Sequence, residues 1–119
     1  MVIYAEDRGS TTQFELGELY DQQEGDFEQA FNWYRKAARK GSRKAQHRLA
    51  SLYARGQGTQ QDLARAYAWC KVAVFQSSRC ARRKLPLIES RLNLEQLRRG
   101  RWLAQEYYDR YVVHRLRMG

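Results

Sequence analysis

The chain has 119 residues, 43% of them hydrophobic, and carries 22 Lys and Arg against 13 Asp and Glu, for a net charge of +9. This length suits one domain, and the composition excludes a disordered, collagen-like or low-complexity chain. Apolar runs are far shorter than the ~20 residues of a membrane span, and Met1–Arg8 contains no apolar signal segment. We therefore expect a cytoplasmic protein without a membrane-spanning helix.

The chain is similar to itself. Phe14–Tyr20 aligns with His47–Tyr53 at an offset of 33 residues, and the segment around Trp33 aligns with that around Trp69 at an offset of 36. Three extra residues in the loop 56–62 of the second copy account for the difference. A period in this range indicates stacked structural repeats.

Each copy is predicted to form two helices, because its apolar residues recur every three or four positions. The first copy has Leu16, Leu19 and Tyr20 and then Phe27 to Ala38, and the second has 45–53 and 63–74. Thr11 or Thr12, Ser42 and Asp62 are the predicted N-caps, with breaks at Gly25, Gly41 and Gly56 to Gly58. Small residues should let helices approach and the two Trp should fill the space between pairs. The predicted packing residues are Leu16, Gly17, Tyr20, Ala30, Trp33, Ala37, Leu49, Tyr53, Ala66, Trp69 and Ala73.

A half repeat and a closing helix are predicted to follow. Ala81, Leu85, Ile88 and Leu92 mark a helix from about Ser78, which Pro86 should kink or restart. Asn93 and Gln96 resemble a capping box, opening a helix to about Leu116 that covers the end of the stack. Its apolar stripe is Leu94, Leu97, Ala104, Tyr108, Tyr111 and Val112, broadened by Trp102, Leu103 and Tyr107. Gly100 should weaken this helix by about 1 kcal/mol and permit a bend. The chain thus divides into an extension at 1–10, repeats at 11–92 (11–44, 45–80 and a half repeat at 81–92), and a capping helix with its tail at 93–119.

The sequence contains no recognisable metal or catalytic pattern. Cys70 and Cys80 are the only thiols, and we expect them to be reduced, buried and unpaired. His47 and His114 add no metal-ligand spacing, and we expect neither a metal nor a cofactor. His47 and Ser51, four residues apart on a helix, form the only candidate base and nucleophile, and no orienting acid accompanies them. We therefore predict that the protein is not an enzyme.

The repeat residues themselves resemble a known family. Gly17 before Leu19-Tyr20, the run from Trp33 to Ala38 followed by Gly41 and Ala45, and Gly56-Gln-Gly58 followed by Asp62, Ala66 and Trp69 are similar to the Sel-like repeat family, a relative of the tetratricopeptide repeat. The resemblance covers roughly residues 11–81, although the second copy has Ala50, Val74 and Ser77 where the first has Gly17, Ala38 and Gly41. It implies an all-α fold, a short right-handed solenoid of antiparallel helix pairs, and an adaptor or scaffold without catalysis.

The resemblance also implies where a partner would bind. Exposed residues on the first helix of each pair should line a concave groove. These are Glu15, Glu18 and Gln22, then Lys44, His47, Arg48, Ser51 and Arg55, then Arg83 and Lys84. Residues 1–30 carry a net charge of −7 and residues 31–119 a net charge of +16. A groove with an acidic end and a basic remainder favours an extended peptide or an acidic helix of another protein.

Two other interactions remain open from the sequence. The pI of about 9.9 and the aromatic residues among arginines in Arg98–Trp102 and Tyr107–Tyr111 are compatible with nucleic-acid binding. The apolar residues of the closing helix could instead form a homodimer or dock a larger protein. Those residues are Trp102, Leu103, Tyr107, Val113 and Leu116.

Overall fold

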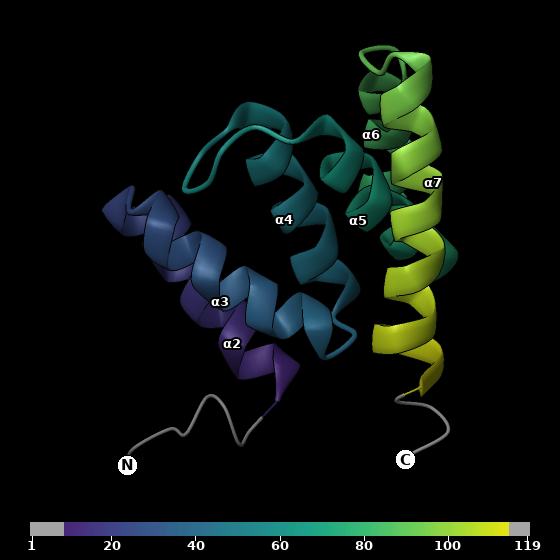
Figure 1. Ribbon diagram of the computed structural model, residues 1–119. Coiled ribbons are helices and arrows are strands. Elements are labelled where there is room, and N and C mark those ends of the chain that lie inside the picture. Colours follow the sequence, from purple (N-terminus) through teal and green to yellow (C-terminus); the bar gives the residue numbers. More distant parts are fainter. Residues whose placement is uncertain (1–8, 115–119) are drawn as a thin grey trace.

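The structure, a computed structural model, describes residues 9–114, and this part of the chain is helical with no strand. The helices are α2 (Ser10–Glu18) with the π-helical segment η1 (Leu19–Glu24), α3 (Phe27–Arg39), α4 (Arg43–Arg55), α5 (Leu63–Phe75), α6 (Arg79–Glu89), and α7 (Leu94–Tyr108) with the π-helical segment η2 (Asp109–Val113). The pairs α2/α3 and α4/α5 stack in succession, and α6 and α7 follow (Figure 1). The predicted all-α solenoid is confirmed.

Most helix starts were predicted correctly. The side chains of Ser42, Asp62 and Asn93 each cap a helix by accepting a hydrogen bond from the backbone N–H three residues later. Asn93 and Gln96 form the predicted capping box, with both reciprocal hydrogen bonds present. The cap at Thr11 or Thr12 was wrong, because α2 already begins at Ser10 and follows Gly9, which gives no side-chain cap.

The chain reversals after α3 and α5 share a left-handed backbone conformation but not a residue type. Gly41 has φ 93°, and Ser77, its counterpart 36 residues later, has φ 68°. A side chain at such a φ costs about 1 kcal/mol, which glycine avoids. We expect Ser77→Gly to raise the free energy of unfolding by about 1 kcal/mol in urea denaturation. Ser90→Gly, at a right-handed helix end, should give no gain, and an equal gain there would contradict strain at Ser77.

The core lies where the helices meet and is built largely from alanine. Helix α3 packs against α2 and α4, and α5 packs against α4, α6 and α7. Nine alanines among the described residues are fully buried: Ala30, Ala37, Ala38, Ala45, Ala50, Ala66, Ala68, Ala73 and Ala81. Leu49, Tyr53 and Trp69 are also buried. The small side chains allow the helix backbones to approach closely, as predicted.

A buried amide, which the sequence analysis did not identify, links consecutive units. Gln46 Nε2 donates to the Ala38 carbonyl, and Gln46 Oε1 accepts from Gln76 Nε2 at 2.8 Å. Gln76 Nε2 also donates to the Gly41 carbonyl at 3.0 Å. Because the Gln46 side chain is fully buried, this network fixes the ends of α3 and α5 relative to the start of α4.

The predicted apolar stripe of the first helix was correct for Tyr20, which packs against the core, and wrong for Leu19. Leu19 is 40% exposed and Leu16 and Tyr20 are half-buried, whereas Phe14 and Gly17 are buried. Helix α4 lies between α3 and α5, but α2 has α3 as its one extensive neighbour among the described residues. The face that is buried in α4 is therefore partly open in α2.

The two tryptophans do not play the same part. Trp69 is 3% exposed, and its ring stacks on Tyr107 of α7 with centroids 4.4 Å apart. Trp33 is only half-buried, and the Lys36 ammonium lies 4.7 Å from its ring centroid. Helix α7 covers α5, and no aromatic ring within residues 9–114 stacks on Trp33. The predicted filling role is thus correct for Trp69 and wrong for Trp33.

Two helix breakers lie inside continuous helices. Helix α6 runs through Pro86 to Glu89 without a restart. Helix α7 runs through the buried Gly100, where a Cβ would lie 2.8 Å from the Tyr67 ring and 3.2 Å from the Ala64 carbonyl oxygen. Gly100, which was predicted to weaken the closing helix, is therefore a point where α5 and α7 approach closely enough to require glycine. Along α7, Leu103 and Ala104 are buried as expected, but Leu94 is 63% exposed.

Both cysteines are free, as expected. Cys70 is buried, its Sγ donates to the Ala81 carbonyl, and burial raises its pKa to about 12. Cys80 is exposed, so the prediction that both are buried was wrong for Cys80. Leu116 and the segments 1–8 and 115–119, on which parts of the sequence predictions fell, lie outside the described residues.

Candidate functional site

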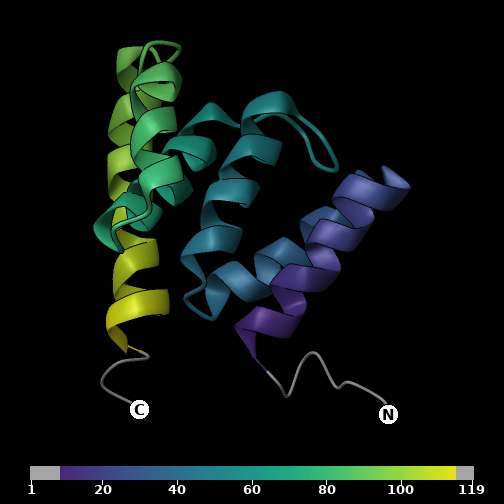
Figure 2. The same ribbon diagram turned by 180° about the vertical axis from the view of Figure 1, so that it is seen from behind.

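The predicted binding residues lie on the face formed by α2, α4 and α6. Figures 1 and 2 show α3 and α7 on one side of the molecule and α2 and α6 on the other. Helix α4 contacts both α2 and α6. We call the surface between α4 and α6 the α4 groove; its central residues are His47, Arg48, Ser51 and Arg55 of α4 and Lys84 of α6.

Lys84 connects the two helices across the α4 groove. Its Nζ donates to Ser51 Oγ at 2.6 Å and lies 3.1 Å from His47 Nδ1. Ser51 Oγ donates to the backbone carbonyl of His47. The hydroxyl and the imidazole therefore do not interact as a nucleophile and its base.

The cations of the α4 groove outnumber the carboxylates near them. A hollow of about 290 Å³ is lined by the cations Arg48, Arg55 and Lys84 and by one carboxylate, Asp21. Arg48 Nη2 lies 3.1 Å from Glu18 Oε2. Within residues 9–114, Arg55 and Lys84 have no carboxylate partner.

Burial, and then the positive charges of the α4 groove, lower the pKa values of two of its groups. Burial, followed by the charges of Arg48 and Arg55, lowers the pKa of Lys84. Burial, followed by Lys84 and Arg48, lowers the pKa of His47 to about 4. The imidazole is therefore neutral at pH 7, and an anion in the groove would be stabilised by its neighbours.

Other predicted groove residues are not part of this cluster. Lys44 lines a neighbouring hollow of about 620 Å³ between the starts of α4 and α6, which His47 also lines, together with Arg43, Arg79 and Arg82. Glu15, Gln22 and Arg83 are exposed and line neither hollow. The acidic side of the predicted groove is thus reduced to Glu18 and Asp21.

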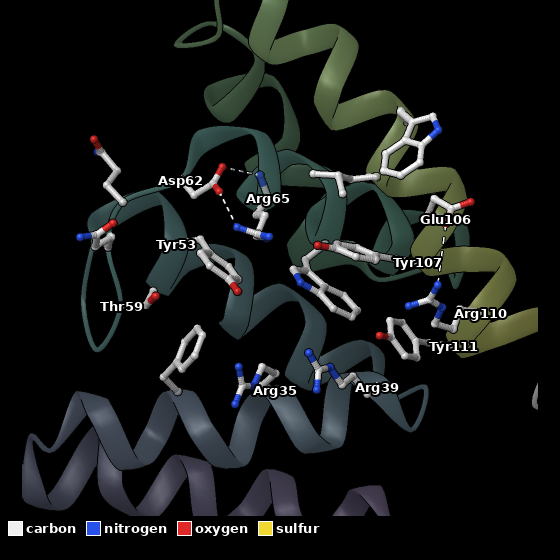
Figure 3. Close-up of a pocket in the computed structure, with 16 residues that line it drawn as sticks. Arg35, Arg39, Tyr53, Thr59, Asp62, Arg65, Glu106, Tyr107, Arg110 and Tyr111 are labelled. Atoms are coloured by element: carbon white, nitrogen blue, oxygen red, sulfur yellow. Dashed lines mark hydrogen bonds and ion pairs between the residues drawn. The ribbon is translucent and has the colours of Figure 1, made fainter.

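A larger cavity lies on the opposite face and was not predicted. This cavity, the α3–α7 basin, has a volume of about 720 Å³ (Figure 3). Its walls are Phe31, Arg35 and Arg39 of α3, Tyr53 of α4, the loop 59–62, Arg65 and Trp69 of α5, and Trp102, Leu103, Glu106, Tyr107, Arg110 and Tyr111 of α7 and η2. Two sequence signals pointed to it: the pair Arg35 and Arg39, four residues apart and so on one helix face, and the aromatic residues among arginines at Trp102 and Tyr107–Tyr111.

One wall of the α3–α7 basin is a stack of aromatic rings. Tyr107 and Tyr111 both stack on Trp69, with centroids 4.4 and 5.7 Å away. Trp102 lies beside this stack and is 63% exposed. The wall is therefore already packed, and Trp102 is its one large open apolar side chain among the described residues.

The arginines of the α3–α7 basin differ in how far they are neutralised. Arg65 Nη1 lies 3.0 Å from Asp62 Oδ2, and Arg110 Nη2 lies 4.0 Å from Glu106 Oε2. Arg35 and Arg39 have no ion-pair partner in the described part of the chain. Figure 3 shows both pointing from α3 toward the interior of the basin.

Several arginines and aromatic residues of the C-terminal segment, which the sequence made candidates for binding nucleic acid, contact other residues of the chain. Tyr107 and Tyr111 face Trp69 and so are not open for stacking on bases, and Arg99 Nη1 lies 3.1 Å from Asp62 Oδ1. Leu103 is buried within the chain. Of the residues on which the nucleic-acid and dimer hypotheses depended, Leu103 and Tyr107 are thus used in internal packing, whereas Trp102 is 63% exposed.

No helix in the described part of the chain is long and apolar enough to cross a membrane. Within the same residues, no three His, Cys, Asp or Glu side chains gather as metal ligands would.

A sequence profile of the Sel1 repeat matches residues 10–42 and 43–74. The chain is 35% identical over 99 residues to alginate biosynthesis protein AlgK of Azotobacter vinelandii. The matched region covers 82% of this chain and 20% of that protein. A crystal structure of a protective antigen present in uropathogenic Escherichia coli strains, displaying an SLR fold, matches with a TM-score of 0.84 and 31% identity over 91% of this chain and 24% of that chain. The chain therefore spans a quarter or less of the proteins that it matches.

Proposed function

The chain belongs to the Sel1 repeat family, and we propose that it is a non-enzymatic protein-interaction module, an adaptor or scaffold that binds an acidic peptide or helix of a partner protein in the α4 groove. Sel1 repeats generally serve as protein-interaction modules. The groove lies on the first helices of the stacked pairs and so extends across more than one unit. A partner segment lying there would contact both α4 and α6.

The observation that carries the proposal is the environment of Lys84. Its ammonium is half-buried, and its close polar contacts are two neutral groups, Ser51 Oγ and His47 Nδ1. Arg48 and Arg55 are its charged neighbours. Cations held together in a hollow are stabilised by an incoming carboxylate, and charge-assisted hydrogen bonds are among the stronger polar contacts.

The test is to remove two charges from the α4 groove without disturbing the fold. Arg48 is a poor choice, since it pairs with Glu18 and its guanidinium lies 6.0 Å from the Phe14 ring centroid. Arg55→Gln with Lys84→Gln avoids that ion pair. We expect the amount of partner protein captured from native lysate to fall about tenfold or more with this variant. Each hydrogen bond to a charged group contributes about 1.5–3 kcal/mol to binding.

The matched control removes the same charge elsewhere. Arg91→Gln with Arg98→Gln alters two exposed arginines that line neither the α4 groove nor the α3–α7 basin, and it should capture partners as the unaltered chain does. Capture is read by mass spectrometry after nuclease treatment. Equal retention by the groove variant would disprove the groove assignment, and loss of all captured protein on nuclease treatment would favour nucleic-acid binding.

A further inference from the structure

We propose that the α3–α7 basin is a second binding site, which takes an acidic segment of a partner protein that carries an aromatic or aliphatic side chain beside its carboxylates. This site is separate from the α4 groove. The chain would then hold two acidic segments at once, one on each face.

The charge of the basin indicates an anionic ligand. Arg35 and Arg39 point into it, and no carboxylate among residues 9–114 pairs with either. Asp62 does not compensate them, because it is already engaged by Arg65 and Arg99. A planar guanidinium binds a carboxylate through two parallel hydrogen bonds, so the pair suits neighbouring acidic residues.

The open side chain of the basin indicates an apolar contact next to that charge. Trp102 is 63% exposed, although Leu103 beside it is buried. Tyr107 cannot turn away to cover Trp102 without losing its stack on Trp69. An apolar side chain of the ligand would cover the indole at little cost in ordering, because the wall is already rigid.

The dimensions and position of the basin fit a short peptide segment. Its volume of about 720 Å³ lies within the range of about 300–1,000 Å³ typical of ligand sites. Its walls come mainly from α3, α5 and α7, with Tyr53 the one contribution of α4, whereas the α4 groove lies between α4 and α6 (Figures 1 and 3). Two segments could therefore bind without overlapping.

The test is a site-resolved titration by nuclear magnetic resonance. The probe is a short synthetic peptide with one leucine between glutamates, and its controls replace the glutamates by glutamine or the leucine by serine. The indole N–H of Trp102 reports the basin, and backbone amides near Lys84 report the α4 groove. We expect the Glu–Leu peptide to shift both sets of signals, and the serine peptide to lose affinity at Trp102 more than at the groove.

Variants separate the two sites. Arg35→Gln with Arg39→Gln should weaken binding at Trp102 about tenfold while the amides near Lys84 titrate unchanged, and Arg55→Gln with Lys84→Gln should do the reverse. A Trp102 signal that does not move with the Glu–Leu peptide, or moves equally in the Arg35/Arg39 variant, would overturn the inference. If the Glu–Leu peptide shifts the Trp102 signal but not the amides near Lys84, binding in the α4 groove is disproved and the inference about the basin stands. Thermal unfolding of each variant checks that it is folded.

Discussion

Trp69→Ala should lower the free energy of unfolding by about 3–5 kcal/mol, the usual cost of emptying a buried aromatic site. The Trp69 ring is 3% exposed and stacks on Tyr107 and Tyr111. It is therefore the main aromatic contact between α5 and the closing segment. Removing it leaves a cavity and two tyrosines without their partner, so α7 should lose much of its attachment. Urea denaturation measures the loss, and hydrogen exchange along α7 shows where it occurs.

Trp33→Ala is the matched control, because Trp33 occupies the equivalent position in the first unit. Its side chain is half-buried and covered on one side by Lys36. Little cavity forms when it is removed, and we expect a loss of about 1 kcal/mol. Similar losses at both positions would contradict the structural difference between them.

The sequence was sufficient for the repeats because their signal is local. Spacings of three and four residues, capping residues such as Ser42 and Asp62, and glycines at reversals all act within one helix or turn. Each copy also repeats the signal of the other, which removes much of the ambiguity of a single helix. The helix pairs could therefore be predicted, and so could the capping box at Asn93 that begins α7.

Where the prediction failed, the cause was the position of a residue in the stack. Equivalent residues in two repeats have the same local pattern but different neighbours. Leu52 is buried on α4, which lies between α3 and α5, while Leu19, its counterpart, is 40% exposed at the start of η1. Gly100 was interpreted from helix propensity, but the close approach of Tyr67 decides its role.

In the candidate site, too, the features set by one helix could be predicted and those set by packing could not. The α4 side of the groove could be predicted, because His47, Arg48, Ser51 and Arg55 share a face through their spacing on one helix. That Lys84 reaches Ser51 could not be predicted, because it depends on the packing of α6 against α4. The α3–α7 basin depends on such packing too, because its lining comes from α3, α4, α5, the loop 59–62 and α7 with η2, which meet only in the folded chain.

Gly17→Ala should lower the free energy of unfolding by about 2 kcal/mol, even though alanine is the better helix former. A Cβ at Gly17 would lie 2.4 Å from Cδ1 of Tyr34. Tyr34 is fully buried and its hydroxyl donates to Asp21 Oδ2 at 2.9 Å, so the ring has little room to move. Overpacking of this kind must shift either the ring or α2.

The second repeat indicates how to test this explanation. At the equivalent positions it has Ala50 and Cys70, a larger residue opposite a smaller one. Tyr34→Cys alone should destabilise the chain through the lost ring and hydrogen bond. In that background, however, Gly17→Ala should be neutral or stabilising by up to about 1 kcal/mol, because the clash is gone and the helix propensity of alanine remains. The double-mutant cycle measures this change of sign. If Gly17→Ala destabilises both backgrounds equally, the contact with Tyr34 is not what requires glycine at position 17.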